Sequence, residues 1–401
     1  MISLENNSMV VRFPNVHPDA VCTIEFQRTL RIPDDNRAHA LPPGLGKFPL
    51  FHTDDYAGRL PPAWSRRGGV FFPMRSAEAM WIRFHSKYPF AIKIATGKIN
   101  AVTGERWTPE LRGPRTVGPA HDLLARGPVS PRIDGWTSPL TPKGGWPTEN
   151  ATPKSWGSEL GQAVLQGTRI EQDQDYVTVP RQPWLDGFSV GKGTIRQFVA
   201  MPMGDGYSVE EQLTGEALHG GLQIMVYPLK AAFYHPVHSI LRGMSGSMGY
   251  TSAASASAQG ICSAAGASVN LCADMGLAPG GLMKQTIHED EYGIDHWDQT
   301  QSARCFVHLL NTQQFRQVTG LEPPQEAPTA AQYASHGLPW FDYYDESAAL
   351  KGSKVLQQLD SVAALSFKKG EQVLPENDPV AAPNTVKLQP RKSNRVREGT
   401  F

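Results

Sequence analysis

The sequence predicts a mainly β protein: an antiparallel sandwich or barrel-like core with a few short helices and long irregular loops. Glycine (38) and proline (33) are abundant among the 401 residues, which disfavours long helices and favours short strands joined by turns. Several segments also alternate apolar and polar residues with a period of two, as strands with one buried face do. The alternative is an α+β fold with two domains divided near Gly243.

The first clear pair of strands is predicted at Ala79–Phe84 and Phe90–Thr96, which are separated by a turn-forming segment with a proline. In Phe90–Thr96 the apolar side chains share one face, and Lys93 points to the other face. We therefore expect these two strands, with a third at residues 97–104, to form a meander in which Lys93 lies on the solvated side.

The stretch from residue 182 to 228 combines β pattern with many polar groups. Its strand-like runs Thr194–Met201 and Gly221–Tyr227 flank a glycine-rich connection and are expected to form the core hairpin of the β domain. Within the connection, Val209–Leu213 is predicted to be a helical turn capped by Ser208. The acidic residues and the histidine of the connection are Asp205, Glu210, Glu211, Glu216 and His219.

The predicted domain organisation is one β-rich core made of residues 1–242 and 271–346. Residues 243–270 are rich in Ser, Ala and Gly and are predicted to be a flexible insertion or linker, because they bury too little apolar area to offset the entropy of ordering. Residues 347–401 are predicted to be a mostly disordered tail. The apolar run Ala303–Leu310 is expected to be buried against the first part of the core.

Charge and composition limit the classes of partner and location. Lys plus Arg and Asp plus Glu number 38 each, whereas dedicated nucleic-acid-binding proteins are usually basic, so no nucleic-acid partner is expected. No window approaches the ~18 apolar residues of a membrane span, and no secretory signal is recognised. The four cysteines form no C-x-x-C pair. We expect a cytoplasmic protein, and homo-oligomerisation stays open.

Recognisable catalytic motifs are absent from the sequence. There is no phosphate-binding G-x-x-x-x-G-K-[ST] loop, no G-x-G-x-x-G between a strand and a helix, and no G-x-S-x-G elbow. The first hypothesis is therefore a non-enzymatic binding or structural β-protein, which presents loops around residues 182–228 to an unknown ligand or protein.

The second hypothesis is a metal-dependent enzyme. Residues 288–298 are dense in imidazole and carboxylate groups, the side chains that bind divalent metals, and an H-x-x-H pair lies upstream. The candidate ligands are His288, Asp290, Asp295, His296, His235 and His238. The spacing matches neither H-E-x-x-H nor an EF-hand loop, so a charged surface loop is the competing interpretation.

Other polar residues are candidates for catalysis or ligand binding. Glu216 and His219 place a carboxylate near an imidazole, as acid–base catalysis requires. Trp184 beside Asp186 could stack a ligand ring, and Arg196 could bind a carboxylate or phosphate. Surface charges, turn residues and a tryptophan at the rim of the core would give the same pattern.

The third hypothesis is a membrane-active or self-assembling protein. In this case the Ser/Ala/Gly-rich residues 243–266 would reorganise on insertion or assembly. The sequence alone does not choose among the three hypotheses.

Overall fold

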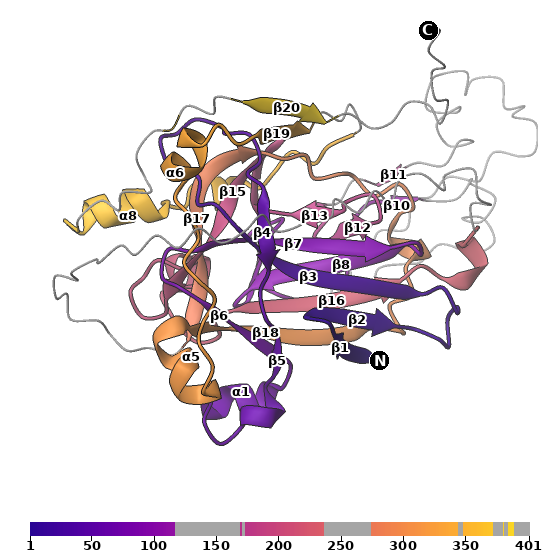
Figure 1. Cartoon of the computed structure of the whole chain (residues 1–401). Helices are drawn as coiled ribbons and strands as arrows, with labels where there is room; N and C mark the ends of the chain where they lie inside the picture. The colour runs from indigo at the N-terminus through magenta and orange to yellow at the C-terminus, as the bar shows by residue number, and fades with distance from the viewer. Residues whose placement is uncertain are drawn as a thin grey trace, which may run out of the picture.

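Two β-sheets packed face to face make up most of the molecule (Figure 1). The computed structural model describes residues 1–116, 169–170, 173–235, 274–343, 348–371, 380 and 384–388. Nearly all pairings within the two large sheets are antiparallel, and the described helices are short. The predicted fold class, mainly β with an antiparallel core, is confirmed.

The first sheet is entirely antiparallel. Its strands are β1 (Ile2–Glu5), β2 (Ser8–Arg12), β3 (Val21–Thr29), β4 (Gly44–Lys47), β7 (Ala79–Ser86), β13 (Trp184–Leu185), β14 (Gly187–Gly191), β15 (Thr194–Pro202) and β17 (Met275–Lys284). The main path runs β1-β2-β3-β7-β15-β14, with β4 on β3, β13 on β7 and β17 on β15. Long-range pairings therefore hold this sheet together.

The second sheet contains one parallel pair, β18 with β6. Its strands are β5 (Phe51–His52), β6 (Val70–Met74), β8 (Phe90–Thr96), β9 (Ile99–Asn100), β12 (Val177–Val179), β16 (Leu222–Pro228) and β18 (Ala303–Asn311). Its order is β12-β8-β16-β18-β6-β5, with β9 on β8. Two smaller pairs are β10 (Arg115–Thr116) with β11 (Arg169–Ile170), and β19 (Trp340–Tyr343) with β20 (Thr385–Leu388).

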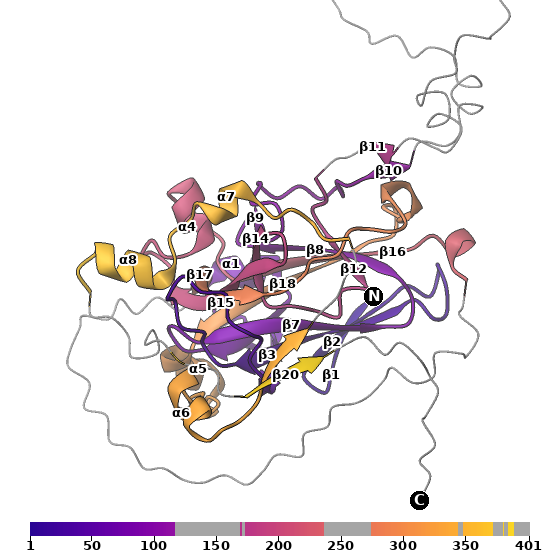
Figure 2. The same ribbon diagram turned by 90° about the horizontal axis from the view of Figure 1, so that it is seen from above.

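The core lies between the two sheets, which Figure 2 shows as two layers. Alternating residues of β3, including Ile24 and Phe26, are fully buried. Phe26 stacks on Phe72 of β6 with ring centroids 5.2 Å apart, and Phe48 stacks on Phe72 at 4.7 Å. Full burial of one such ring stabilises the fold by roughly 2–3 kcal/mol, so these rings join the sheets.

The predicted core hairpin is wrong. β15 pairs with β7, β14 and β17 in the first sheet, whereas β16 pairs with β8 and β18 in the second. The connection 203–221 therefore crosses from one sheet to the other. In the predicted meander, β8 does pair with β9, but β7 and β8 are in different sheets, so their predicted pairing is also wrong. A hairpin and a crossing between sheets have the same local pattern, and only distant pairings distinguish them.

Strand β17 forms although its sequence is interrupted by glycines. A Cβ atom on Gly276 would lie 2.6 Å from the Cβ of Ser208, and one on Gly281 would lie 2.5 Å from the carbonyl oxygen of Pro33. The glycines thus allow other backbone segments to approach the strand closely.

Short helices cover the ends of the sheets. They are α1 (Pro62–Arg67), α4 (Val209–Thr214), α5 (Thr312–Thr319), α6 (Ala330–Ser335), α7 (Lys354–Gln357), α8 (Val362–Lys368) and the 3-10 turns η1 (Asp54–Tyr56), η2 (Ala231–Phe233) and η3 (Ile294–His296). Ser208 caps α4 as predicted, in a capping box with Glu211. In the part of the chain that the structure describes, no helix is both long and apolar enough to span a membrane.

Part of the segment assigned to the tail packs on the core. In residues 348–371, Leu356 of α7 and Val362 of α8 are fully buried, and the backbone N–H of Ser353 donates to Ser189 of β14 at 2.9 Å. Strand β18, the expected apolar run, is paired on both sides and largely buried. Residues 243–270 and 389–401 lie outside the described residues.

Candidate functional site

The crossing between the sheets is fixed from inside by one buried carboxylate. Glu210, in the first turn of α4, has its side chain 4% exposed. Its Oε1 is 2.6 Å from His219 Nδ1, and its Oε2 accepts from the backbone N–H groups of His219 at 3.1 Å and Gly220 at 3.0 Å. The carboxylate that pairs with His219 is therefore Glu210, whereas the predicted partner Glu216 is exposed.

A second carboxylate of α4 holds the beginning of the crossing. Glu211 Oε1 accepts from the backbone N–H groups of Gly204 at 2.7 Å and Gly206 at 3.0 Å. Its Oε2 accepts from the backbone N–H of Ser208 at 3.1 Å, which completes the capping box. The short helix thus aims two acidic side chains inward, and both hold backbone amides of the crossing.

The outer side of the crossing is held by α1. The guanidinium of Arg67 donates to the carbonyl oxygen of Leu218 at 3.1 Å and to that of His219 at 3.2 Å. Leu218 itself is 58% exposed. Residues 215–219, hereafter the presented turn, are thus fixed by hydrogen bonds from two helices, and residues 215–218 of the turn are exposed.

Beneath the presented turn lies a buried group of aromatic and ionisable side chains. The indole N–H of Trp64 donates to Asp274 Oδ2 at 3.1 Å, and the Trp64 ring stacks on His308 with centroids 4.4 Å apart. Burial raises the pKa of Asp274 to about 6 and lowers the pKa of His308 to about 4. His308 is therefore neutral at pH 7 and packs as an aromatic ring.

The candidate ligand-binding residue Trp184 has no large pocket beside it. Its ring meets Tyr343 edge-on at 5.4 Å. The cavity that it borders with Gln182 and His288 has a volume of about 10 Å³, which is room for about one water molecule.

The polar groups of Asp186 and Arg196 are both hydrogen-bonded to other residues of the protein. Asp186 Oδ2 accepts from Gln285 Nε2 at 2.5 Å, and burial raises the pKa of Asp186 to about 7. Arg196 donates to the carbonyl oxygen of Gly280 at 3.1 Å and to Asp34 Oδ1 at 3.5 Å. These contacts connect loops to β15 and β17. They also occupy the carboxylate oxygen of Asp186 and the guanidinium of Arg196, the groups that a ligand would need.

Among the metal candidates, Asp290 is a structural anchor. It is 1% exposed. Its Oδ2 accepts from the hydroxyl of Tyr176 at 2.5 Å, the indole N–H of Trp297 at 2.9 Å and the backbone N–H of Gly293 at 3.0 Å. Its Oδ1 accepts from the backbone N–H of Tyr292 at 2.9 Å. Four donors thus occupy the oxygens that a metal ion would need.

The other metal candidates do not form a ligand set. His288 is buried, Asp295 and His235 are exposed, and His296 packs edge-on against Phe233 with centroids 4.3 Å apart. His238 lies outside the described residues. Among the described residues, no group of three or more His, Cys, Asp or Glu side chains could hold a metal ion. The divalent metal stays a prediction without structural support.

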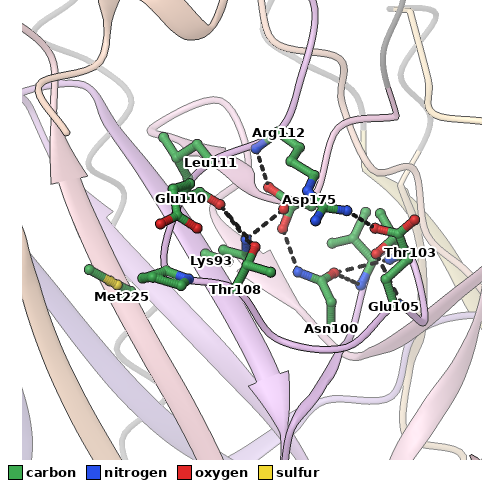
Figure 3. A network of polar contacts seen from close by, with 12 residues as sticks. Lys93, Asn100, Thr103, Glu105, Thr108, Glu110, Leu111, Arg112, Asp175 and Met225 are labelled. Atoms are coloured by element: carbon green, nitrogen blue, oxygen red, sulfur yellow. Dashed lines mark hydrogen bonds and ion pairs between the residues drawn. The ribbon is translucent and has the colours of Figure 1, made fainter. Parts of the chain in front are cut away.

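Sequence reasoning missed the buried network around Lys93, which Figure 3 shows from close by. Both faces of β8 are buried, so the prediction that Lys93 lies on a solvated face is wrong. Its Nζ donates to Asp175 Oδ2 at 2.6 Å, the carbonyl oxygen of Glu110 at 2.6 Å and Thr108 Oγ1 at 3.2 Å. These partners are 15, 17 and 82 residues away from Lys93 in the sequence, so no local pattern signals them.

Asp175 joins the segment that precedes residue 117 to the segment that begins at residue 173. Its Oδ1 accepts from the backbone N–H of Arg112 at 2.9 Å, and its own carbonyl oxygen accepts from Asn100 Nδ2 at 2.7 Å. Burial raises the pKa of Asp175, and the nearby charges of Lys93 and Arg112 oppose this rise. The network therefore holds together described segments that precede and follow residues 117–172.

Replacing Glu210 by alanine is expected to lower the free energy of unfolding by about 2–4 kcal/mol, because two backbone N–H groups and the His219 ring lose their acceptor. The matched change at the exposed Glu216 is expected to alter it by less than about 0.5 kcal/mol. Urea denaturation of both variants gives the two values. Equal effects would contradict the pairing of His219 with Glu210.

Comparison with known proteins assigns no family to the chain, so its function has to be inferred from the geometry of its own residues. No family model, no curated protein and no solved structure matches it.

Proposed function

We propose that the chain is a non-enzymatic binding or structural β-protein that offers the presented turn to a ligand or protein partner. The observation that carries the proposal is the fixation of this exposed turn by Glu210 and Arg67 from opposite sides. A loop that is already ordered loses little conformational entropy on binding, and binding residues often lie on loops positioned by a rigid scaffold.

The side chains of the presented turn indicate the kind of partner. Glu216 and Leu218 are both exposed on this fixed backbone. An apolar depression would accept the leucine, and a neighbouring cation would pair with the glutamate. The partner's identity stays open, and homo-oligomerisation is one form that such an interaction would take.

The contacts of the other candidate residues favour this proposal over an enzyme. Asp186 is bonded to Gln285, and Arg196 to Asp34 and Gly280. If His219 took part in acid–base catalysis, its carboxylate partner would be Glu210 and not Glu216. The metal-dependent enzyme remains an alternative proposal. Stoichiometric zinc, iron, manganese or calcium in the purified full-length protein would favour it.

The membrane-active or self-assembling protein also remains an alternative proposal. Its segment 243–266 lies outside the described residues. Liposome leakage and size-exclusion chromatography, with and without these residues, would test it: an inert monomer in both forms would remove it. The cytoplasmic location stays a prediction, which localisation of the tagged chain in its native cells would test.

Site-specific photo-crosslinking tests the proposed function. A benzophenone amino acid replaces Leu218 in one full-length variant and Leu338, which is 43% exposed, in a control variant. In an extract of the cells that make the protein, the position-218 variant is expected to give a discrete adduct that excess unlabelled protein abolishes. No adduct at position 218, or the same adduct from position 338, would contradict the proposal.

A further inference from the structure

Lys93 and Asp175 differ from the other lysine–carboxylate pairs of the described residues in their burial. Their side chains are 1% and 4% exposed, with Nζ and Oδ2 2.6 Å apart. Lys368 and Asp360 are just as close, at 2.7 Å, but are 62% and 34% exposed. The pairs formed by Lys47 and by Lys284 are also longer and more exposed. A primary amine and a carboxyl group are thus in contact in a place from which water is excluded.

The surroundings make a neutral product favourable. The Nζ of Lys93 lies 5.4 Å from the centre of the Trp107 ring, and β8 is buried along its whole length. Removing two charges from water is costly, and their attraction offsets this cost only with very good geometry. An uncharged amide in the same place would avoid the desolvation of both ions.

The contacts around the pair also suit nucleophilic addition. Reacting groups held in contact behave as if at very high concentration. The backbone N–H of Arg112 donates to Asp175 Oδ1 at 2.9 Å, the oxygen on which negative charge develops during addition. The carbonyl oxygen of Glu110 and Thr108 Oγ1 accept from the amine and orient it. Burial raises the pKa of Asp175 and so favours the neutral acid.

We propose that Lys93 and Asp175 condense after folding into an intramolecular amide crosslink. The ammonium group first passes one proton to Oδ2, which leaves a neutral amine and a neutral acid. The nitrogen lone pair attacks Cγ, and a new N–C bond forms. The C–Oδ2 bond then breaks, and Oδ2 leaves as water with that proton and a second one from the nitrogen. Oδ1 remains as the amide oxygen that accepts from Arg112. No oxidant or cofactor is consumed.

The crosslink would act as a covalent brace between β8 and the residue two positions before β12. It would join positions 82 residues apart in the sequence and so close a covalent loop of the chain between them. Closing a long loop covalently restricts the unfolded chain, as a disulfide does. Unlike a disulfide, an amide is indifferent to the redox state of its surroundings.

Mass spectrometry of the denatured full-length protein tests the proposal. The expected mass is that of the sequence minus one water, and digestion is expected to give a branched peptide that joins Lys93 to Asp175. The exposed pair Lys368 and Asp360 is the internal control and should give no branch. A linear mass with unbranched peptides, or equal branching at the exposed pair, would overturn the proposal.

Two variants separate the chemistry from mere proximity. Lys93→Arg keeps the charge but lacks a nucleophilic amine, so this variant should keep its full linear mass. Asp175→Asn should release ammonia instead of water and reach the same final mass as crosslinked wild type. A water loss that persists in Lys93→Arg would overturn the assignment. If either variant fails to fold, the presence or absence of the branched peptide in the wild type still shows whether the crosslink forms.

Discussion

Replacing Asp290 by alanine is expected to lower the free energy of unfolding by about 3–5 kcal/mol. The change leaves the hydroxyl of Tyr176, the indole N–H of Trp297 and two backbone N–H groups without their acceptor. Buried donors without a partner cost about 1–3 kcal/mol each, and losses in one network are not fully additive. The segment that carries η3 is expected to loosen first.

The matched control lies five residues away. Asp295 was predicted as a metal ligand for the same reasons, but it is exposed, so Asp295→Ala should change the free energy of unfolding by less than about 0.5 kcal/mol. Urea titration followed by tryptophan fluorescence measures both variants. Similar stabilities of the two variants would contradict the anchoring role of Asp290.

Replacing Asp186 by asparagine is expected to stabilise the protein at pH 8 but not at pH 4. Burial raises the pKa of this carboxyl in the folded state to about 7, from an ordinary value of 3.8. Between these pH values the unfolded state releases the proton and the folded state keeps it, so stability falls as the pH rises. Above pH 7 the carboxyl is ionised in both states, and the full loss of folding free energy, on the order of 4 kcal/mol, remains.

The difference in the free energy of unfolding between this variant and the wild type reports on the ionisation of Asp186. Asparagine is neutral at every pH and can still accept from Gln285 Nε2, which bonds Asp186 in the wild type. Free energies of unfolding at pH 4, 5, 6, 7 and 8 should therefore diverge progressively, with the variant more stable at high pH. Parallel curves would show that Asp186 titrates normally and is not desolvated in the folded state.

Sequence reasoning predicted the elements whose signals are local. Ser208 is predicted to cap a helical turn and forms a capping box with Glu211. The runs at β15 and β16 were recognised as strands, because hydrophobic periodicity is set by neighbours in the chain.

Features that depend on distant contacts could not be read from the sequence. β15 and β16 enter different sheets, and β17 was missed because its glycines serve contacts with Ser208 and Pro33. A lysine in an alternating strand predicts a solvated face, but Lys93 is covered by groups that are 17 and 82 residues away in the sequence.

The sequence pattern around His219 does not predict the contacts that the histidine makes. The crossing and His219 were singled out, whereas Glu210 was passed over in favour of Glu216, which is closer to the histidine in sequence. The turn of α4 places Glu210 inward and leaves Glu216 in solvent. No sequence signal separates two glutamates six residues apart in this way before the helix is positioned.

Hydrogen exchange at His219, in the presented turn, and at the adjacent Gly220 tests most directly the claim that the turn is fixed. The backbone N–H groups of His219 and Gly220 donate to the buried carboxylate of Glu210. These two amides are expected to exchange as slowly as those of β16, and to lose that protection in Glu210→Ala while β16 keeps its own. Rapid exchange at both amides in the wild-type protein would contradict the claim.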